Sequence, residues 1–77
     1  MYTNKLEDAV MITVSDVREG SLVMVRGNFG GGFATLGKVL EVEDDIKNGL
    51  PGIGYIIEKE THGNWAYMSQ VDSVVKY

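Results

Sequence analysis

The segment from Leu22 to Arg26 restricts the fold of this chain more than any other. It reads Leu-Val-Met-Val-Arg, is apolar except at its last residue, and is bounded by Gly20 and Gly27. A run this short fits a strand and is too short for a helix, and its unbroken apolar character predicts a strand buried on both faces. A glycine-rich loop over residues 29–35 then leads to a second predicted strand, residues 37–44.

Length and cysteine usage limit what this strand pair can belong to. The chain has 77 residues and no cysteine, so neither disulfides nor thiolate metal sites can support the fold. A chain of this size buries only about 60% of the surface that its unfolded form exposes. We therefore predict a single domain over residues 10–77, a loosely ordered N-terminus over residues 1–9, and a function at the surface rather than in an internal cavity.

The charge balance and hydropathy exclude several classes of protein. Eleven acidic residues against seven basic ones give a net charge of -4, which opposes non-specific attraction to phosphate backbones and anionic lipids. No apolar run approaches the ~20 residues of a membrane helix, and the first ten residues lack the apolar centre of a secretory signal. We expect a soluble, cytoplasmic protein with no membrane contact.

The rest of the chain reads as short strands separated by turn signals. Residues 10–14 are β-branched and apolar and predict a first strand, and residues 16–20 predict a single helical turn capped by Ser15 or Asp16, with Gly20 as its left-handed exit. The period-two pattern slips between Val39 and Val42, which indicates a bulge or bend. Residues 44–52 predict a structured loop, with Pro51 excluding a central strand.

The C-terminal third continues this pattern. Residues 53–60 and 65–68 predict two strands joined by a tight turn at residues 61–64, and residues 69–72 predict a 3₁₀ turn before a last strand at residues 73–77. No segment of the chain places its apolar residues at the 3.6-residue spacing of a helix. Five or six short strands at this spacing predict an all-β fold, a small antiparallel barrel.

One motif resembles a known family. Val23-x-Val25-x-Gly27-x-Phe29-x-Gly, followed by Gly37-x-Val39-x-x-Val42, is similar to the KOW motif of SH3-like barrels in transcription elongation factors and ribosomal proteins. The resemblance covers roughly residues 21–43 and implies an SH3-like barrel in which the valines fill the interior. The loop is lengthened by residues 31–35, and the basic residues are reduced to Arg26 and Lys38, which disfavours nucleic-acid binding.

A second resemblance lies further along the chain. Asp45-Ile46-Lys47-Asn48-Gly49-x-Pro51-Gly52-Ile53-x-Tyr55, followed by Trp65-Ala66-Tyr67 and Gln70-Val71, looks like short uncharacterised proteins of bacteria and tailed bacteriophages. The likeness implies no activity. For a phage protein it would place the chain in the host cytoplasm.

Polar motifs give no catalytic or metal site. Gly30, Gly31 and Gly32 suggest a phosphate cradle, but a strand rather than a helix follows them, so a plain hairpin loop is favoured. The acidic run over residues 41–45 lacks the donor spacing of a calcium loop, and His62 has no second histidine or cysteine beside it in the sequence. A nucleophile would need an activating base that this chain does not supply. We predict a protein that is not an enzyme and that uses neither a cofactor nor a metal.

Aromatic residues give the stronger binding signal. We predict a partner-binding set in the segments that would line the open side of the barrel, namely Phe29, Phe33, Tyr55, Trp65 and Tyr67. The alternative for Trp65 is a place in the core, whereas Phe29 and Phe33 would form an exposed patch in the glycine-rich loop.

Three functions follow from these features. The favoured one is a small non-catalytic protein-interaction module, such as a phage accessory protein that modulates a host complex, docking through its aromatic loops or a free strand edge. The second is a KOW-type binder of nucleic acid or ribonucleoprotein, with a basic stripe of Arg26, Lys38, Lys47 and Lys59. The third is a homo-oligomer that holds a small ligand such as a nucleotide at a shared interface. The predicted anion or nucleic-acid contacts are Arg26, Gly30, Gly31, Gly32 and Lys38.

Overall fold

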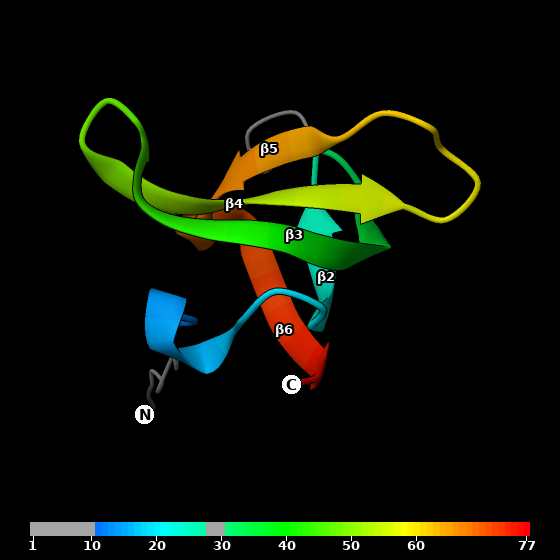
Figure 1. Cartoon of the computed structure of the whole chain (residues 1–77), viewed down its shortest axis with the longest axis horizontal. Coiled ribbons are helices and arrows are strands. Elements are labelled where there is room, and N and C mark those ends of the chain that lie inside the picture. The colour runs from blue at the N-terminus through cyan, green and yellow to red at the C-terminus, as the bar shows by residue number, and fades with distance from the viewer. Residues whose placement is uncertain (1–10, 28–30) are drawn as a thin grey trace.

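The computed structural model describes residues 11–27 and 31–77, and this part of the chain is all-β, as predicted (Figure 1). Five antiparallel strands form one sheet in the order β5-β4-β3-β2-β6. The elements are η1 (Val14–Asp16), β2 (Leu22–Arg26), β3 (Ala34–Lys47), β4 (Leu50–Ile57), β5 (Asn64–Tyr67), η3 (Met68–Gln70) and β6 (Val71–Lys76). Within the described ranges, no helix is both long and apolar enough to traverse a bilayer.

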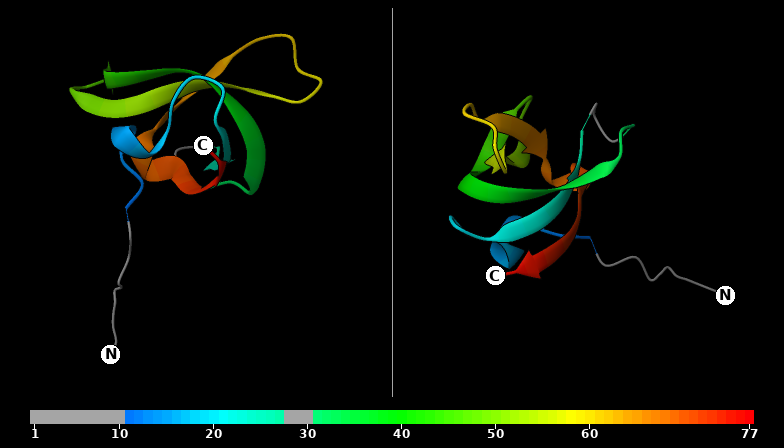
Figure 2. Two further views of the ribbon diagram at one scale, coloured as in Figure 1. Left: turned by 60° about the horizontal axis from the view of Figure 1, so that its bottom comes forward. Right: turned by 90° about the vertical axis from the view of Figure 1, so that its right-hand side faces the viewer.

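The sheet bends around the core but does not close. β3 pairs through its first part with β2 and through most of its length with β4, so it belongs to both halves of the bend (Figure 2). β5 and β6 lie at opposite ends of the strand order, and the three-residue turn η3 alone connects them. The prediction of an all-β fold with five or six antiparallel strands is therefore confirmed, with five in the described residues, whereas the predicted closure into a barrel is not.

The core lies on the inner face of the bend. Val23 and Val39 are fully buried, and Val25 and Ile53 nearly so, as the valine pattern predicted. Burial alternates along β2, with Leu22 and Met24 only half-buried. The prediction that this strand is buried on both faces is thus wrong, because no other described strand or helix covers its outer face. The buried apolar residues are Val17, Val23, Val25, Val39, Ile53, Tyr55, Ala66, Met68 and Val71.

The β3–β4 connection corrects a predicted loop. A register shift between Val39 and Glu41 confirms the expected bulge. Residues 44–52 do not form a loop, because β3 continues to Lys47 and β4 begins at Leu50. The turn is only Asn48 and Gly49, whose φ angles of 58° and 76° are the left-handed pair that a two-residue hairpin favours.

Pro51 lies inside the central strand β4, contrary to prediction. It falls where the β3–β4 register is irregular and one residue before the pairing of β4 with β5 begins at Gly52. A proline is tolerated at such a position because its missing N–H interrupts no regular ladder.

The N-terminal segment also differs from its prediction. Residues 11–13 form no strand, and η1 begins at Val14 instead. The backbone N–H of Thr13 donates to the Asp16 carboxylate at 2.8 Å, and this local bond stabilises a helical turn in place of an extended strand. Gly20 has the predicted left-handed conformation, with φ of 94°. The predictions for residues 1–9 lie outside the described residues.

Hydrogen bonds from two buried polar side chains hold the ends of the sheet. The Ser21 hydroxyl accepts the Arg18 N–H and donates to the Tyr77 carbonyl, each at 2.9 Å. Gln70 accepts the Tyr67 N–H at 3.0 Å and donates to the Arg26 carbonyl at 2.7 Å. Gln70 therefore attaches the predicted 3₁₀ turn, which forms one residue earlier than expected, to the end of β2.

Candidate functional site

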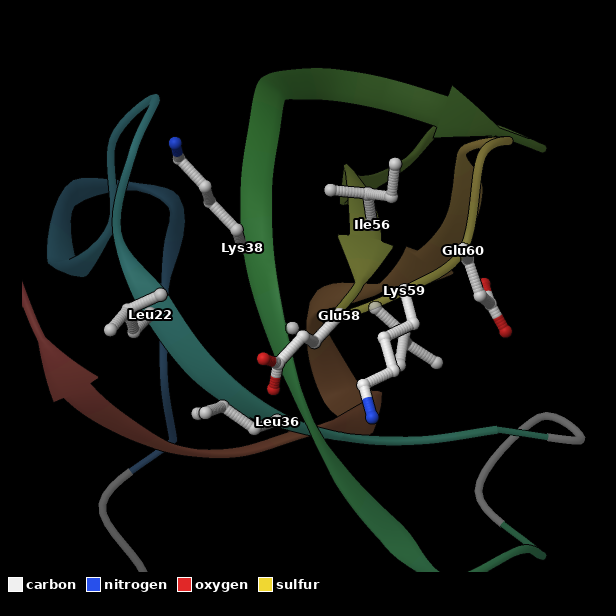
Figure 3. Close-up of a pocket in the computed structure, with 9 residues that line it drawn as sticks. Leu22, Leu36, Lys38, Ile56, Glu58, Lys59 and Glu60 are labelled. Atoms are coloured by element: carbon white, nitrogen blue, oxygen red, sulfur yellow. The ribbon is translucent and has the colours of Figure 1, made fainter.

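An apolar groove runs across the outer face of β2, β3 and β4 (Figure 3). Its volume is about 370 Å³, and Leu22, Leu36 and Ile56 line it from three neighbouring strands. Charged side chains surround it, Lys38 from β3 and Glu58, Lys59 and Glu60 from the loop after β4. We call the cavity that these residues line the apolar groove.

Strand register explains how these side chains come together. Leu22 lies opposite Lys38, which in turn lies opposite Ile56, and Leu36 lies opposite Met24. Neighbouring residues in register point to the same side of a sheet, so this row faces away from buried Val23 and Val39. Leu36 is 43% exposed. An antiparallel sheet with one solvated face normally carries polar residues there, so the apolar character of this face needs another explanation than packing within the chain.

Sequence analysis did not identify the apolar groove. Its signal was the unbroken apolar run at residues 22–25, which was interpreted as burial on both faces. Residues 22–25 are indeed all apolar, but only one of the two faces of strand β2 is buried by the rest of the fold.

A second surface lies on the outer face of β3, β4 and β5. Glu41, Gly54 and Trp65 are aligned in register across these strands. Trp65 is 38% exposed, and its ring meets that of Tyr67 edge to face at 5.2 Å between centroids. The Lys47 ammonium lies 5.4 Å from the Trp65 ring centroid, within the range of a cation–π interaction.

The aromatic residues predicted to bind a partner lie in different parts of the structure. Trp65 and Tyr67 lie together on the outer face, and the Tyr67 hydroxyl accepts a hydrogen bond from Asn48 at 3.0 Å. Phe33 is 92% exposed in the segment that leads into β3, and Phe29 lies outside the described residues. The set therefore does not form one continuous partner surface among the described residues.

Tyr55 belongs to the core, which corrects its assignment to a binding face. It is 6% exposed, and its ring packs over Gly37, where a Cβ atom would come within 2.8 Å of the ring. Burial raises the pKa of the Tyr55 hydroxyl, and the nearby Glu60 carboxylate raises it further. The register of β4 places Tyr55 on the inner face next to Val39, opposite to the face of Gly54.

The predicted anion contacts are largely engaged within the fold. The Arg26 Nε lies 2.8 Å from the Asp72 carboxylate, and an Arg26 terminal nitrogen donates to the Gly32 carbonyl at 3.1 Å. The Gly32 N–H donates to the Gly27 carbonyl, so this amide closes the loop rather than pointing to a ligand. Gly31 begins the described part of that loop after the gap, and Gly30 lies outside the described residues.

The four basic residues of the expected stripe are distributed over separate places. Arg26 pairs with Asp72 at the end of β2, Lys47 lies over Trp65, and Lys38 and Lys59 lie at the apolar groove. In residues 11–27 and 31–77, no three side chains of His, Asp or Glu gather as they would to hold a metal ion.

Comparisons with known proteins give no match: no family model, no curated protein and no solved structure aligns significantly with this chain. The arguments about function therefore depend on the geometry of its own surface.

Proposed function

We propose that this protein is a small non-catalytic protein-interaction module that binds a partner protein through the apolar groove. The observation that carries the proposal is the groove that exposed Leu36 and half-buried Leu22 and Ile56 line from three neighbouring strands. Contiguous apolar surface on a small domain is characteristic of an interaction site, since water contact there is unfavourable.

We further infer that the domain is of the SH3-like type. The order of its strands supports this, because the last strand, β6, returns to pair with the first described strand, β2. The buried Val23, Val25 and Val39 of the KOW-like motif support it as well. The bent open sheet leaves its outer face accessible for the function proposed above.

The partner segment should be apolar at its centre. The charges around the apolar groove are mixed in sign, with Lys38 and Lys59 opposing Glu58 and Glu60, so they do not favour a polyanion. Burial of apolar side chains is insensitive to moderate salt, because no long-range charge attraction is screened. Complex formation should therefore change little with ionic strength, unlike binding to nucleic acid.

Site-specific photo-crosslinking tests the proposal. A photoreactive phenylalanine analogue at Leu36 should form adducts with a partner protein in cell extract, whereas the same residue at Val75 should not. Val75 is a matched control, since it is apolar, 57% exposed and in strand β6, and it is not among the residues that line the apolar groove. Equal adduct yields at both positions would reject the proposal, as would adducts formed only with nucleic acid or only with a second copy of the chain.

A further inference from the structure

A row of three residues crosses the outer face of β3, β4 and β5. Strands β3, β4 and β5 lie side by side in the sheet (Figure 1), and Glu41, Gly54 and Trp65 are in register across them. We call this row the Trp65 slot. Its central residue is a glycine, with a tryptophan on the neighbouring strand to one side and a glutamate on the neighbouring strand to the other.

The absence of a side chain at Gly54 allows the Glu41 carboxylate to lie over strand β4. A Cβ atom at Gly54 would lie 3.0 Å from Glu41 Cγ and 3.1 Å from Glu41 Oε2. The Glu41 side chain therefore extends over Gly54, in the direction of β5. Strands in a sheet are about 4.8 Å apart, so the carboxylate is brought about one strand spacing nearer to Trp65 than its own backbone is.

The neighbouring row shows that this arrangement is specific to Gly54. Gly52 lies between Glu43 and Tyr67 in the same register, but a Cβ atom there would clash with the Ile46 side chain and the Ala66 carbonyl. Ile46 fills that row with an apolar side chain. At Gly54 the closest group is the flexible, exposed Glu41, which can adjust to an incoming ligand.

Charge indicates which ligand the Trp65 slot prefers. The Lys47 ammonium already lies 5.4 Å from the Trp65 ring centroid, so the ring accepts a cation within the fold. The Glu41 carboxylate forms no ion pair within the described residues. An indole face attracts cations, and a carboxylate binds a guanidinium in two parallel hydrogen bonds.

We propose that Glu41, Gly54 and Trp65 bind an arginine side chain of the partner protein. The planar guanidinium stacks on the Trp65 ring, displaces the Lys47 ammonium, and donates hydrogen bonds to the Glu41 carboxylate. Arginine suits this site better than lysine because its planar, weakly hydrated cation both stacks and forms a fork of hydrogen bonds. The inference rests on the proposed function, since the arginine belongs to the partner that the apolar groove binds.

The single tryptophan makes the Trp65 slot directly observable. Trp65 is the only tryptophan of the chain, so its indole N–H gives one identifiable signal in a nitrogen-correlated NMR spectrum. Titration with an acetylated and amidated Gly-Arg-Gly peptide should shift this signal saturably. The same peptide with citrulline, a neutral isostere of arginine, should not shift it.

Matched variants identify the groups involved. Glu41→Gln should weaken the arginine peptide about fivefold, and Lys47→Gln should strengthen it about threefold because the competing ammonium is removed. Glu19→Gln removes the same charge from the turn before β2, away from the Trp65 slot, and should leave binding unchanged. The backbone signals of the same spectra show whether each variant remains folded.

Three results would overturn the proposal: an equal response to the citrulline peptide, an equal loss in Glu19→Gln and Glu41→Gln, or a stronger response to a uridine trinucleotide, which would indicate base stacking. The peptide titration is independent of the crosslinking at Leu36. A silent indole signal together with adducts at Leu36 would reject the Trp65 slot alone, whereas a responsive indole signal without adducts would reject the apolar groove alone.

Discussion

The two faces of strands β2, β3 and β4 carry similar side chains and have opposite environments. On the inner face, Val23 and Val39 are fully buried. On the outer face, Leu22, Leu36 and Ile56 line the apolar groove. Burial of apolar surface contributes roughly 25 cal/mol per Å², and the inner face uses this free energy for folding. On the outer face this free energy is not used for folding, and the proposed function would use it for association with a partner.

The largest effect should come from a charge on the inner face. Val39→Asp places a carboxylate at a site with 0% exposure, and burying an unpaired charge costs more than a small domain's whole stability margin of roughly 5 kcal/mol. We expect loss of the β spectrum in circular dichroism and of dispersed NMR signals. Val75→Asp, on the exposed part of β6, is the control and should remain folded. A native melting temperature for Val39→Asp would show that the inner face is not the core.

A smaller loss of stability should follow from adding one methyl group to the inner face. In Gly37→Ala the new Cβ would come within 2.8 Å of the buried Tyr55 ring, so the ring or the strand must shift. Overpacking of this kind costs about 1–3 kcal/mol, which urea unfolding measures. Gly27→Ala adds the same methyl group where no atom lies within 4 Å, and its stability should change by no more than about 0.5 kcal/mol. Equal urea midpoints for the two variants would contradict the close packing of Tyr55.

The hydroxyl of Tyr55 should make stability depend on alkaline pH. Burial, aided by Glu60, raises its pKa in the folded state above the ordinary value of 10.0. Above pH 10 the unfolded chain loses this proton while the folded chain still holds it, so stability should fall as the pH rises through that range and not depend on Tyr55 below it. Urea unfolding between pH 8 and 11 measures this slope. Tyr55→Phe should reduce the slope and Tyr67→Phe should retain it; the reverse result would show that the Tyr55 hydroxyl is not the titrating group.

The smallest change in stability should come from the outer face. Leu36→Ser removes a side chain that is 43% exposed, so the free energy of unfolding should change by no more than about 0.5 kcal/mol. The same variant should abolish formation of the complex with the partner protein, because it removes an apolar side chain that lines the apolar groove. A loss of stability as large as that of Gly37→Ala would show that the outer face is packed within the fold, and the contrast between the two faces would disappear.

Patterns within short stretches of the sequence correctly predicted those elements that depend mainly on interactions between neighbouring residues. The apolar run at residues 22–26 formed a strand, the slip after Val39 formed a bulge, and Gly20 took the left-handed conformation. The Asn48-Gly49 pair was one of three turn signals between residues 44 and 52, and only the pairing of the flanking strands showed that it alone makes the turn. The predicted strand at residues 10–14 failed because the bond from Thr13 to Asp16 competes with extended backbone.

The positions of the candidate-site residues depend on the pairing of strands that are distant in the sequence, more than the strands and turns themselves do. Tyr55 and Trp65 are aromatic residues of neighbouring strands and gave the same signal in the sequence. The register pairs Trp65 with Gly54 rather than with Tyr55, so the two rings point to opposite faces of the sheet. A shift of one residue in register would exchange their environments, because side chains alternate with a period of two.

The amino-acid sequence by itself determined that this chain is all-β and that valines at 23, 25 and 39 occupy its interior, because strand propensity and alternation are properties of neighbouring residues. The tertiary structure decided which faces are covered. Whether the second face of β2 is buried depends on residues distant in the chain, and the sheet stays open with β5 and β6 at its two ends. That open geometry leaves Leu22, Leu36 and Ile56 to line the apolar groove and aligns Glu41 with Trp65, and neither result follows from any single stretch of the sequence.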